Sequence, residues 1–386
     1  MHSNAQAIMP PAWIGIIGGG QLGKMLTLAA QNWGYKVVIL DPNPASPAGA
    51  VAHKHLCYPY EDLEGLALFK ALASVITYEF EHLPMAMFDH LEKSNIPIIP
   101  SPNTLRVIQD KYLQKCHLKD HGLPVALDQE VKSVDQVKDF MDQFGPGIIK
   151  PRLGGYDGKG TYFVREKDQV EGAFDQFKDL DLYIEQLVDF EMEISIMVAK
   201  STDATYTFPV SENIHNQGIL ITSIVPARIS KDLREKAQAI ASQAIDSFKS
   251  IGLFCVEMFV TRQGDILINE IAPRAHNSGH YTIEACGYSQ FDQWLRILTG
   301  LPLGQSKVFN PSVMINILGP EARAGLFHLK GLETISSLED VYFHWYGKVT
   351  TSHRRKLGHI TVLNPQVDQA LEDANRALEA LIIEER

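Results

Sequence analysis

Two glutamates are predicted to face each other across a β-hairpin. Predicted strands at Phe254–Thr261 and Ile266–Ile271 flank a short polar segment. If Gln263-Gly264 forms a two-residue turn, counting back places Glu257 opposite Glu270, whereas a three-residue loop would shift this register. Directly opposed side chains have Cβ atoms about 4.5–5.5 Å apart, so two like charges repel there. A hard cation such as Mg²⁺ would offset the repulsion. The alternative is a pair of solvated glutamates on an open face.

The segment after this hairpin concentrates polar functional groups. Ala272–His280 carries two imidazoles, a guanidinium and an amide. A lone histidine is more often structural, but so many polar groups on one loop after a strand usually mark a site. In a regular strand Asn269 points away from the face of Glu270. We therefore expect the strand to bulge or end there, unless Asn269 acts from elsewhere.

A glycine-rich loop, Lys150–Thr161, is the second candidate. Four glycines lie among cations after a predicted strand that ends at Lys150. Backbone N–H groups of such a loop can surround phosphates and exclude water, and Lys150 would supply a fixed positive charge. The sequence does not match the Walker A pattern. The alternative is an exposed hairpin tip.

Glycines near the N-terminus fit a third pattern. Gly18, Gly20 and Gly23 match G-x-G-x-x-G between a strand and a helix, and Asp41 lies where a ribose-binding acid would stand. This pattern alone is typical of a dinucleotide site. However, such a loop can bind any phosphorylated ligand, and NAD or FAD would not explain the features downstream. We therefore favour another phosphorylated ligand, with a structural turn as the alternative.

The elements that must position these groups begin with a βαβ unit. Strands at Trp13–Ile17 and Lys36–Leu40 enclose a helix at Gln21–Asn32, which predicts an N-terminal doubly wound parallel sheet. Further strands are predicted at Ser74–Glu79, Ile96–Ile99, Gly147–Lys150, Leu182–Leu187, Glu193–Ala199, Val313–Leu318 and His359–Leu363. Further helices are predicted at Pro84–Lys93, Leu105–His121, Asp232–Ser250 and Pro365–Glu384, the last with Asn364 as its N-cap.

Composition limits the classes of function. The chain has 386 residues, a length that predicts two or three domains, and 45% of them are hydrophobic. The formal charge of −11 disfavours a nucleic-acid binder, although local basic clusters can still bind an anionic substrate. Four scattered cysteines with no C-x-x-C spacing indicate neither zinc nor a redox pair. Neither a signal peptide nor an apolar run of about 18 residues is found, so we expect a soluble, cytoplasmic protein without a membrane partner.

These motifs together resemble a known family. Lys150 with the glycine loop, and Glu257 with Asn269-Glu270, resemble the ATP-grasp superfamily. Within it, the sequence is similar to the 5-(carboxyamino)imidazole ribonucleotide synthetase family. The matching segments are Gly18–Gly23, Val225–Arg228, Glu270–Thr282 and Arg355–His359. The resemblance covers nearly the whole chain beyond the first dozen residues.

The resemblance implies a fold and an activity. It implies an α/β and α+β protein with an N-terminal doubly wound domain at 1–102, an ATP-grasp domain at 103–305 and a small β-rich domain at 306–386, usually as a homodimer. ATP would phosphorylate bicarbonate to carboxyphosphate, and the amine of 5-aminoimidazole ribonucleotide would be carboxylated, with release of ADP and phosphate in purine synthesis. ATP and Mg²⁺ are the implied cofactors.

The resemblance also implies roles for individual residues. The segment Glu185, Gln186, Leu187 and Val188 would hold adenine through backbone groups, and Glu193 would bind the ribose. The phosphates would be surrounded by Arg106, Lys111, Lys150, Gly155, Tyr156, Asp157, Gly158, Lys159, Gly160 and Thr161, with His215 nearby. Glu257 and Glu270 would hold Mg²⁺ beside Asn269. Catalytic roles in the bicarbonate and aminoimidazole site fall to Tyr156, Asp157, Arg274, His276, Asn277 and Lys356, and the ribonucleotide would be bound by Gly20, Gln21, Leu22, Glu79, Arg355 and Lys356.

The chain also departs from the family pattern. Pro151 and Leu153 replace polar and basic neighbours of Lys150. The stretch before Arg355 lacks the usual Arg-Pro-Gly, so either Arg354 or Arg355 is the candidate for the substrate phosphate. Three other functions remain open at this stage: another ATP-grasp ligase, a nicotinamide dehydrogenase, and a non-catalytic ATP-binding module.

Overall fold

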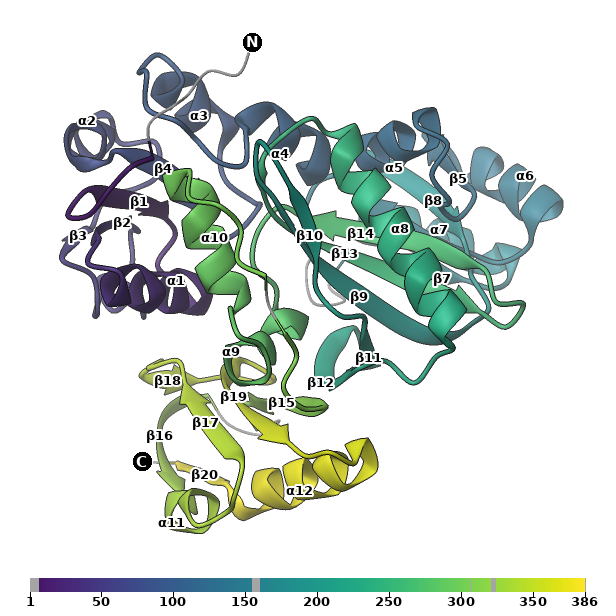
Figure 1. Ribbon diagram of the computed structural model, residues 1–386. Coiled ribbons are helices and arrows are strands. Elements are labelled where there is room, and N and C mark those ends of the chain that lie inside the picture. The colour runs from purple at the N-terminus through teal and green to yellow at the C-terminus, as the bar shows by residue number, and fades with distance from the viewer. Residues whose placement is uncertain (1–6, 155–159, 306, 321–323, 386) are drawn as a thin grey trace.

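The computed structural model describes residues 7–154, 160–305, 307–320 and 324–385 (Figure 1). An N-terminal α/β unit, a central unit with two sheets and a C-terminal unit follow one another along the chain. The predicted α/β and α+β fold class is confirmed. Across the described residues no helix is both long enough and apolar enough to span a membrane.

The N-terminal unit is a parallel sheet in the order β3-β2-β1-β4. Side chains of β1 lie on both faces of this sheet. Ile14 and Ile16 pack towards α1, while Ile17 packs towards α2 and α3. The predicted strand at 96–99 is reduced to one bridge between Ile98 and Ile76. The elements are β1 (Trp13–Ile17), α1 (Gln21–Asn32), β2 (Lys36–Leu40), β3 (Lys54–Leu56), α2 (Leu63–Leu72), β4 (Val75–Tyr78) and α3 (Met85–Leu91).

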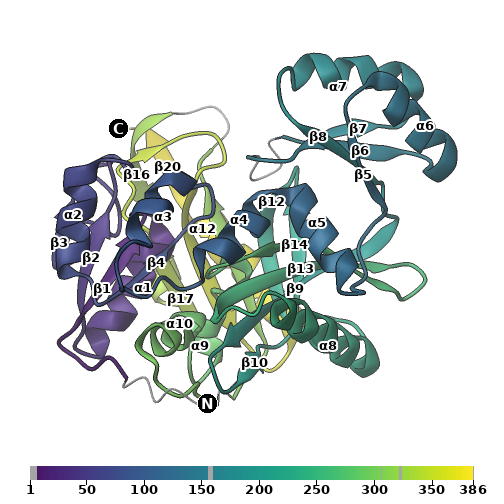
Figure 2. The ribbon, with the colours of Figure 1, turned by 90° about the horizontal axis from the view of Figure 1, so that it is seen from above.

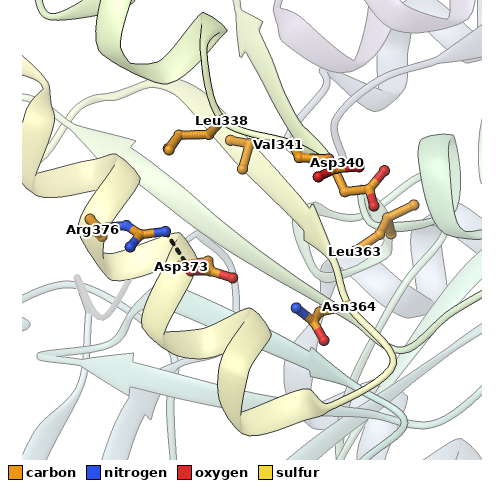
Figure 3. A pocket seen from close by; sticks show the side chains of 8 residues that line it. Leu338, Asp340, Val341, Leu363, Asn364, Asp373 and Arg376 are labelled. Carbon is orange, nitrogen blue, oxygen red and sulfur yellow. Dashed lines mark hydrogen bonds and ion pairs between the residues drawn. The ribbon is translucent and has the colours of Figure 1, made fainter.

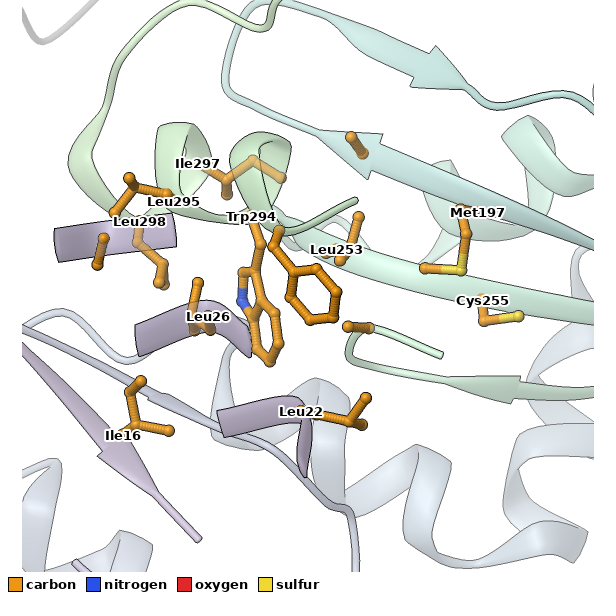
Figure 4. Packing of buried hydrophobic residues seen from close by; sticks show 14 of the residues in the cluster. Ile16, Leu22, Leu26, Met197, Leu253, Cys255, Trp294, Leu295, Ile297 and Leu298 are labelled. Atoms are coloured by element: carbon orange, nitrogen blue, oxygen red, sulfur yellow. The ribbon is translucent and has the colours of Figure 1, made fainter. Parts of the chain in front are cut away.

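A shared apolar core joins this unit to the centre of the molecule. Trp294 of α10 (Gln290–Thr299) is fully buried against Leu22 and Leu26 of α1 (Figure 4). The same cluster includes Cys255, two residues from Glu257. Because packed interiors transmit position, this core fixes the N-terminal glycine loop relative to the acidic hairpin.

The smaller central sheet is antiparallel, in the order β5-β8-β6-β7. With α6 and α7 on one face it forms a lobe that stands beside the rest of the molecule (Figure 2). Its elements are β5 (Asp128–Val131), α6 (Val134–Phe144), β6 (Gly147–Pro151), β7 (Tyr162–Val164), the 3-10 turn Lys167–Gln169, α7 (Val170–Gln176) and β8 (Leu182–Gln186).

The larger sheet has the order β14-β13-β9-β11-β12-β15-β19-β17 among the described residues, with β10 paired to β9. The helix α8 packs on the face formed by β9 and β13. The central elements are β9 (Phe190–Lys200), β10 (Thr205–Thr207), β11 (Ser211–Asn216), β12 (Ile219–Val225), α8 (Lys231–Ser247), β13 (Gly252–Thr261), β14 (Ile266–Ala272), the 3-10 turn Asn277–Gly279 and α9 (Thr282–Ala285).

The C-terminal unit continues this sheet. Its strands β15, β19 and β17 extend the ladder beyond β12, and α12 covers one face. The short strands β18, β16 and β20 pair with one another. The elements are β15 (Ser312–Leu318), β16 (Gly325–Lys330), α11 (Leu332–Ser336), β17 (Val341–Trp345), β18 (Thr350–Thr351), β19 (Lys356–Leu363), α12 (Val367–Ala380) and β20 (Ile382–Glu385).

Two helix predictions were wrong in detail. The predicted helix at 105–121 is two helices, α4 (Pro102–Gln109) and α5 (Lys111–Asp120), because Asp110 is extended and its side chain caps the Leu113 amide. The C-terminal helix ends at Ala380, and Gln366 rather than Asn364 is its N-cap.

Candidate active site

The acidic hairpin brings Glu257 and Glu270 directly opposite each other, as predicted. The predicted route to this register was wrong. The Thr261 amide donates a hydrogen bond to the Asp265 carbonyl, so the hairpin loop has three residues. The resulting one-residue shift in register is compensated by a bulge at Asn269. A β-bulge re-aims the side chain of the extra residue. The strand therefore bulges at Asn269, which was one of the outcomes expected from the sequence.

Lys111, at the start of α5, neutralises one of the two carboxylates. Its Nζ lies 2.6 Å from Glu270 Oε2. This ammonium holds the pKa of Glu270 well below its usual range. Burial raises the pKa of Glu257, and the charge on Glu270 raises it further. In the protein alone, Glu270 is therefore the charged partner, and Glu257 is the one that retains a proton.

A second set of charges lies on the smaller sheet. Lys150 of β6 lies 3.0 Å from Glu185 of β8, and Lys115 of α5 lies 3.5 Å from the same carboxylate. Lys115 and Glu185 are nearly inaccessible to solvent. Burial alone would raise the pKa of Glu185, but the two ammonium groups outweigh it and lower this pKa to about 2. Lys115 was missed because nothing local distinguishes one helical lysine from another.

The predicted adenine segment follows this network. The amides of Gln186 and Leu187 donate to the Leu127 and Pro146 carbonyls. Any adenine contact through this segment must therefore use its other backbone groups. On the larger sheet, Glu193 lies 2.9 Å from His215 Nδ1. Burial opposes protonation of His215, but the hydrogen bond to Glu193 and the charge of that carboxylate raise its pKa.

The polar loop after β14 places Arg274 and His276 beside the hairpin. Arg274 donates two hydrogen bonds to Glu81, at 2.5 and 2.9 Å, and a third to the Ala275 carbonyl. His276 Nε2 lies 3.4 Å from Glu257 Oε1. Burial, with the charges of Arg274 and Lys356, lowers the pKa of His276 to about 3, so the ring is neutral at pH 7.

Asn277 points elsewhere. Its amide exchanges hydrogen bonds with Asn316 of β15, within the buried sheet. Its predicted catalytic role thus has a competing structural one. The two candidate arginines are also engaged: Arg355 donates to Thr350, and Arg354 to the turn at Asn216. Lys356 opens β19.

The N-terminal glycine loop is occupied by the chain's own carboxylate. Glu79 accepts hydrogen bonds from the Gly20 amide and, at 2.7 Å, from the Gly23 amide. A Cβ at residue 20 would lie 2.5 Å from this carboxylate, which explains the glycine. Asp41, which lies where a dinucleotide site would have its ribose-binding acid, is likewise engaged, with the Gly19 amide and the Tyr60 hydroxyl. Gln21 and Leu22 begin α1, and the Leu22 side chain is buried in the core.

Three further predictions have separate outcomes. Arg106 was predicted to contact phosphate. In the structure it forms ion pairs with Asp89 and Glu92 of the N-terminal unit. Gly160, with a positive φ, and Thr161 end the glycine loop. Gly155, Tyr156, Asp157, Gly158 and Lys159 lie outside the described residues.

A pocket joins several of these groups. It lies between the β4–α3 loop, α5 and the hairpin, and its lining includes Glu81, Lys111, Glu257, Glu270, Arg274 and His276. Glu81 was missed because its partner Arg274 is 193 residues away along the chain. A different pocket, beside α12 and the Asp373–Arg376 ion pair, contains none of the predicted site residues (Figure 3).

The class of protein follows from this fold and from comparison with known families. The ATP-grasp domain family matches residues 116–291, which include Lys150, Glu185 and the acidic hairpin. The ribonucleotide synthetase preATP-grasp domain family matches residues 12–109, and the phosphoribosylaminoimidazole carboxylase C-terminal domain family matches residues 312–373. The protein is therefore an ATP-grasp enzyme.

Full-length relatives identify the family. The N5-carboxyaminoimidazole ribonucleotide synthase of Bacillus subtilis is 37% identical over 370 residues, covering 95% of this chain and 96% of the relative. A solved synthetase of this name, in complex with ADP, has a TM-score of 0.90 and 39% identity, with 97% of this chain and 98% of that chain covered. The Aspergillus clavatus enzyme, solved with ADP and 5-aminoimidazole ribonucleotide, has a TM-score of 0.87 and 32% identity, covering 96% and 98%. The chain belongs to the N5-carboxyaminoimidazole ribonucleotide synthase family.

Proposed function

We propose that this enzyme uses ATP to carboxylate the amine of 5-aminoimidazole ribonucleotide with bicarbonate, in purine biosynthesis. The observation that carries the proposal is the acidic hairpin. Its opposed glutamates adjoin Lys111 on one side and the Arg274–His276 loop on the other, within one pocket. A nucleotide-phosphate site at Lys111 and a small-anion site at Arg274 and His276 would then adjoin each other, which suits the transfer of a phosphoryl group to bicarbonate.

The opposed carboxylates fit Mg²⁺. Two opposed glutamate carboxylates offer the hard oxygen ligands that Mg²⁺ prefers, and the neighbouring Asn269 would add an amide oxygen. The raised pKa of Glu257 also indicates that the pair lacks enough positive charge with Lys111 alone. Glu257 and Glu270 would hold the ion, which would supply positive charge to neutralise the phosphates of ATP.

The remaining residues divide between ATP and the other two substrates, bicarbonate and the ribonucleotide. Lys111, Lys150 and Thr161 would contact ATP phosphates, with Arg106 joining them if it leaves Asp89 and Glu92. The lobe at Glu185–Val188 would hold adenine through backbone groups other than the two engaged amides, and Glu193 would bind the ribose. Gly155–Lys159 would complete the phosphate loop.

Bicarbonate and the ribonucleotide would bind across the domain boundary. Arg274 and His276 would orient bicarbonate, with Lys356 and Asn277 nearby. Glu79 with Gly20, Gln21 and Leu22 would contact the ribonucleotide. The Glu79 carboxylate accepts hydrogen bonds from hydroxyl groups and repels phosphate, so it suits the ribose. Arg355 or Arg354 would then bind the phosphate of the ribonucleotide.

The proposed reaction has two balanced steps. A bicarbonate oxygen attacks the γ-phosphorus of ATP, which forms carboxyphosphate and releases ADP. The substrate amine then attacks the carboxyl carbon, the C–O bond to phosphate breaks, and the amine proton leaves with inorganic phosphate. Carboxyphosphate hydrolyses readily in water, so enclosure by the loops is the main demand on the site.

We also propose that the enzyme acts in the cytoplasm as a homodimer, with domains at 1–102, 103–305 and 306–386. The C-terminal strands continue the central sheet, so we expect the last two domains to unfold together. Sedimentation and limited proteolysis test these points.

An omission assay tests the function. ADP release is measured with ATP, Mg²⁺, bicarbonate and 5-aminoimidazole ribonucleotide, each left out in turn. We expect rapid release only in the complete mixture. Release that ignores the ribonucleotide would contradict the assigned substrate and favour another ATP-grasp ligase, whereas no release would favour a non-catalytic ATP-binding module.

A further inference from the structure

A buried chain of hydroxyl groups leads from His276 into the larger sheet. Ser278 Oγ lies 2.9 Å from His276 Nδ1 and 2.7 Å from Ser195 Oγ of β9. Ser195 Oγ in turn lies 2.8 Å from Ser211 Oγ of β11. The three serines are at most 3% exposed, and none lines the pocket. Water is therefore excluded from a path that ends on a pocket residue.

The far end of the chain fixes the direction of every hydrogen bond. Ser211 Oγ also lies 3.1 Å from the Ser195 carbonyl, which can only accept, so the single hydrogen of Ser211 is donated there. Ser195 must then donate to Ser211. Its hydrogen is thereby used, so Ser278 donates to Ser195. Since the hydrogen of Ser278 is also used, Nδ1 of His276 must donate to Ser278.

Two neighbouring contacts agree with this direction, the 3.8 Å contact of Cys255 Sγ with Ser278 Oγ allows it if the thiol donates, and one long contact is an exception. Asn213 Nδ2 donates to Ser195 Oγ at 2.8 Å, and Ser223 orients that amide by donating to Asn213 Oδ1 at 2.8 Å. The exception is the Ser278 amide, which lies 3.4 Å from Nδ1. That distance is outside the usual range of about 2.7–3.2 Å, whereas the hydroxyl contact lies within it.

We propose that Ser278, Ser195 and Ser211 are positioning residues that hold His276 as its Nδ1–H tautomer. Nε2 then carries a lone pair and lies in the pocket, 3.4 Å from Glu257. A hydrogen bond on one ring nitrogen commonly sets what the other can do. On the proposed function, Nε2 accepts a hydrogen bond from the hydroxyl group of bicarbonate or the substrate amine, and so orients the group that reacts.

The tautomer can be measured in the free enzyme. Histidine ¹⁵N chemical shifts distinguish protonated from unprotonated ring nitrogens, and His276→Gln assigns the signals of this ring. We expect wild type to carry its proton on Nδ1. In Ser211→Ala, Ser195 loses its acceptor, its hydrogen turns to Ser278, and that of Ser278 turns to Nδ1. The ring should therefore change to the Nε2–H form. Ser223→Ala removes a hydroxyl from the same network without reversing it and should retain the wild-type form.

Kinetics supply a second readout. For Ser211→Ala we expect kcat to fall roughly 10- to 100-fold while KM for ATP stays within about twofold. Ser223→Ala and the hydroxyl-retaining Ser211→Thr should stay close to wild type. A wild-type ring protonated on Nε2, or an unchanged tautomer in a folded Ser211→Ala protein, would overturn the proposal. If the wild-type enzyme shows no ribonucleotide-dependent ADP release, the proposed function fails, while the ¹⁵N shifts still decide the tautomer.

Discussion

Replacing Glu81 with glutamine should weaken the attachment of the N-terminal unit to the active-site loop. Arg274 donates two hydrogen bonds to this carboxylate, and the side chains of Arg274 and Glu81 are only 16% and 20% exposed. Glutamine preserves the shape and one acceptor oxygen. It removes the negative charge that balances a largely buried guanidinium.

Two independent routes give the size of the effect. Breaking a buried ion pair by removing one partner costs about 3–5 kcal/mol. Burial alone would raise the pKa of Glu81, but Arg274 lowers it from 4.5 to about 2, which corresponds to about 3 kcal/mol. Because glutamine keeps one hydrogen bond and water reaches both side chains, we expect a loss of about 2 kcal/mol in unfolding free energy, or roughly 2–3 °C in Tm for a chain of this length.

The pH dependence has a defined sign. The folded pKa of Glu81 lies below its unfolded value, so the stabilisation is complete above about pH 5 and is lost as the pH falls from about 4.5 towards 2. The difference in stability between wild type and Glu81→Gln should therefore be constant from pH 8 to about 5 and shrink in more acidic solution.

Thermal and urea unfolding at several pH values test this, with the exposed Glu61→Gln as a control that should match wild type. Equal stability of Glu81→Gln and wild type at neutral pH would refute the reasoning. So would a difference that grows as the solution is made more acidic.

Three further predictions concern the hairpin, the buried lysine and the arginines. Deleting Asn269 should restore a regular ladder with the other residue pairs unchanged. The protein should then fold, with circular dichroism near wild type, but lose most turnover. An unfolded product would contradict the bulge. Lys115→Met should leave Glu185 with one ammonium partner and raise KM for ATP, and should lower unfolding free energy by about 1–3 kcal/mol; unchanged KM and Tm would contradict it. Of Arg354→Ala and Arg355→Ala, the one that contacts the substrate phosphate should raise KM for the ribonucleotide by roughly 10-fold or more, and the other should not; equal, small effects would exclude both.

Local patterns were sufficient for much of the hairpin and for the first βαβ unit. Alternation placed Glu257 and Glu270 on facing strands, but the correct register arose from two errors that cancel. The loop is one residue longer than assumed, and Asn269 adds a residue to β14. Turn length and bulges depend on backbone geometry at single residues, which alternation of polar and apolar side chains does not encode.

Other features that the sequence did not reveal involve partners distant in sequence. Asp110 breaks an apparently continuous helix because it caps α5 and binds Arg152, 42 residues away. Similarly, Glu79 fills the glycine loop from 56 residues away. A helical period gives no sign of either contact, because both depend on tertiary packing.

The central claim is that this enzyme forms a carbon–nitrogen bond between bicarbonate and the ribonucleotide amine. The most direct measurement combines ¹³C-bicarbonate and ribonucleotide labelled with ¹⁵N at that amine, with ATP and Mg²⁺, and follows the mixture by NMR. We predict a new ¹³C signal split by one-bond coupling to ¹⁵N, formed with one ADP per product. ADP formation without a coupled ¹³C–¹⁵N signal, measured before the product decays, would contradict the claim.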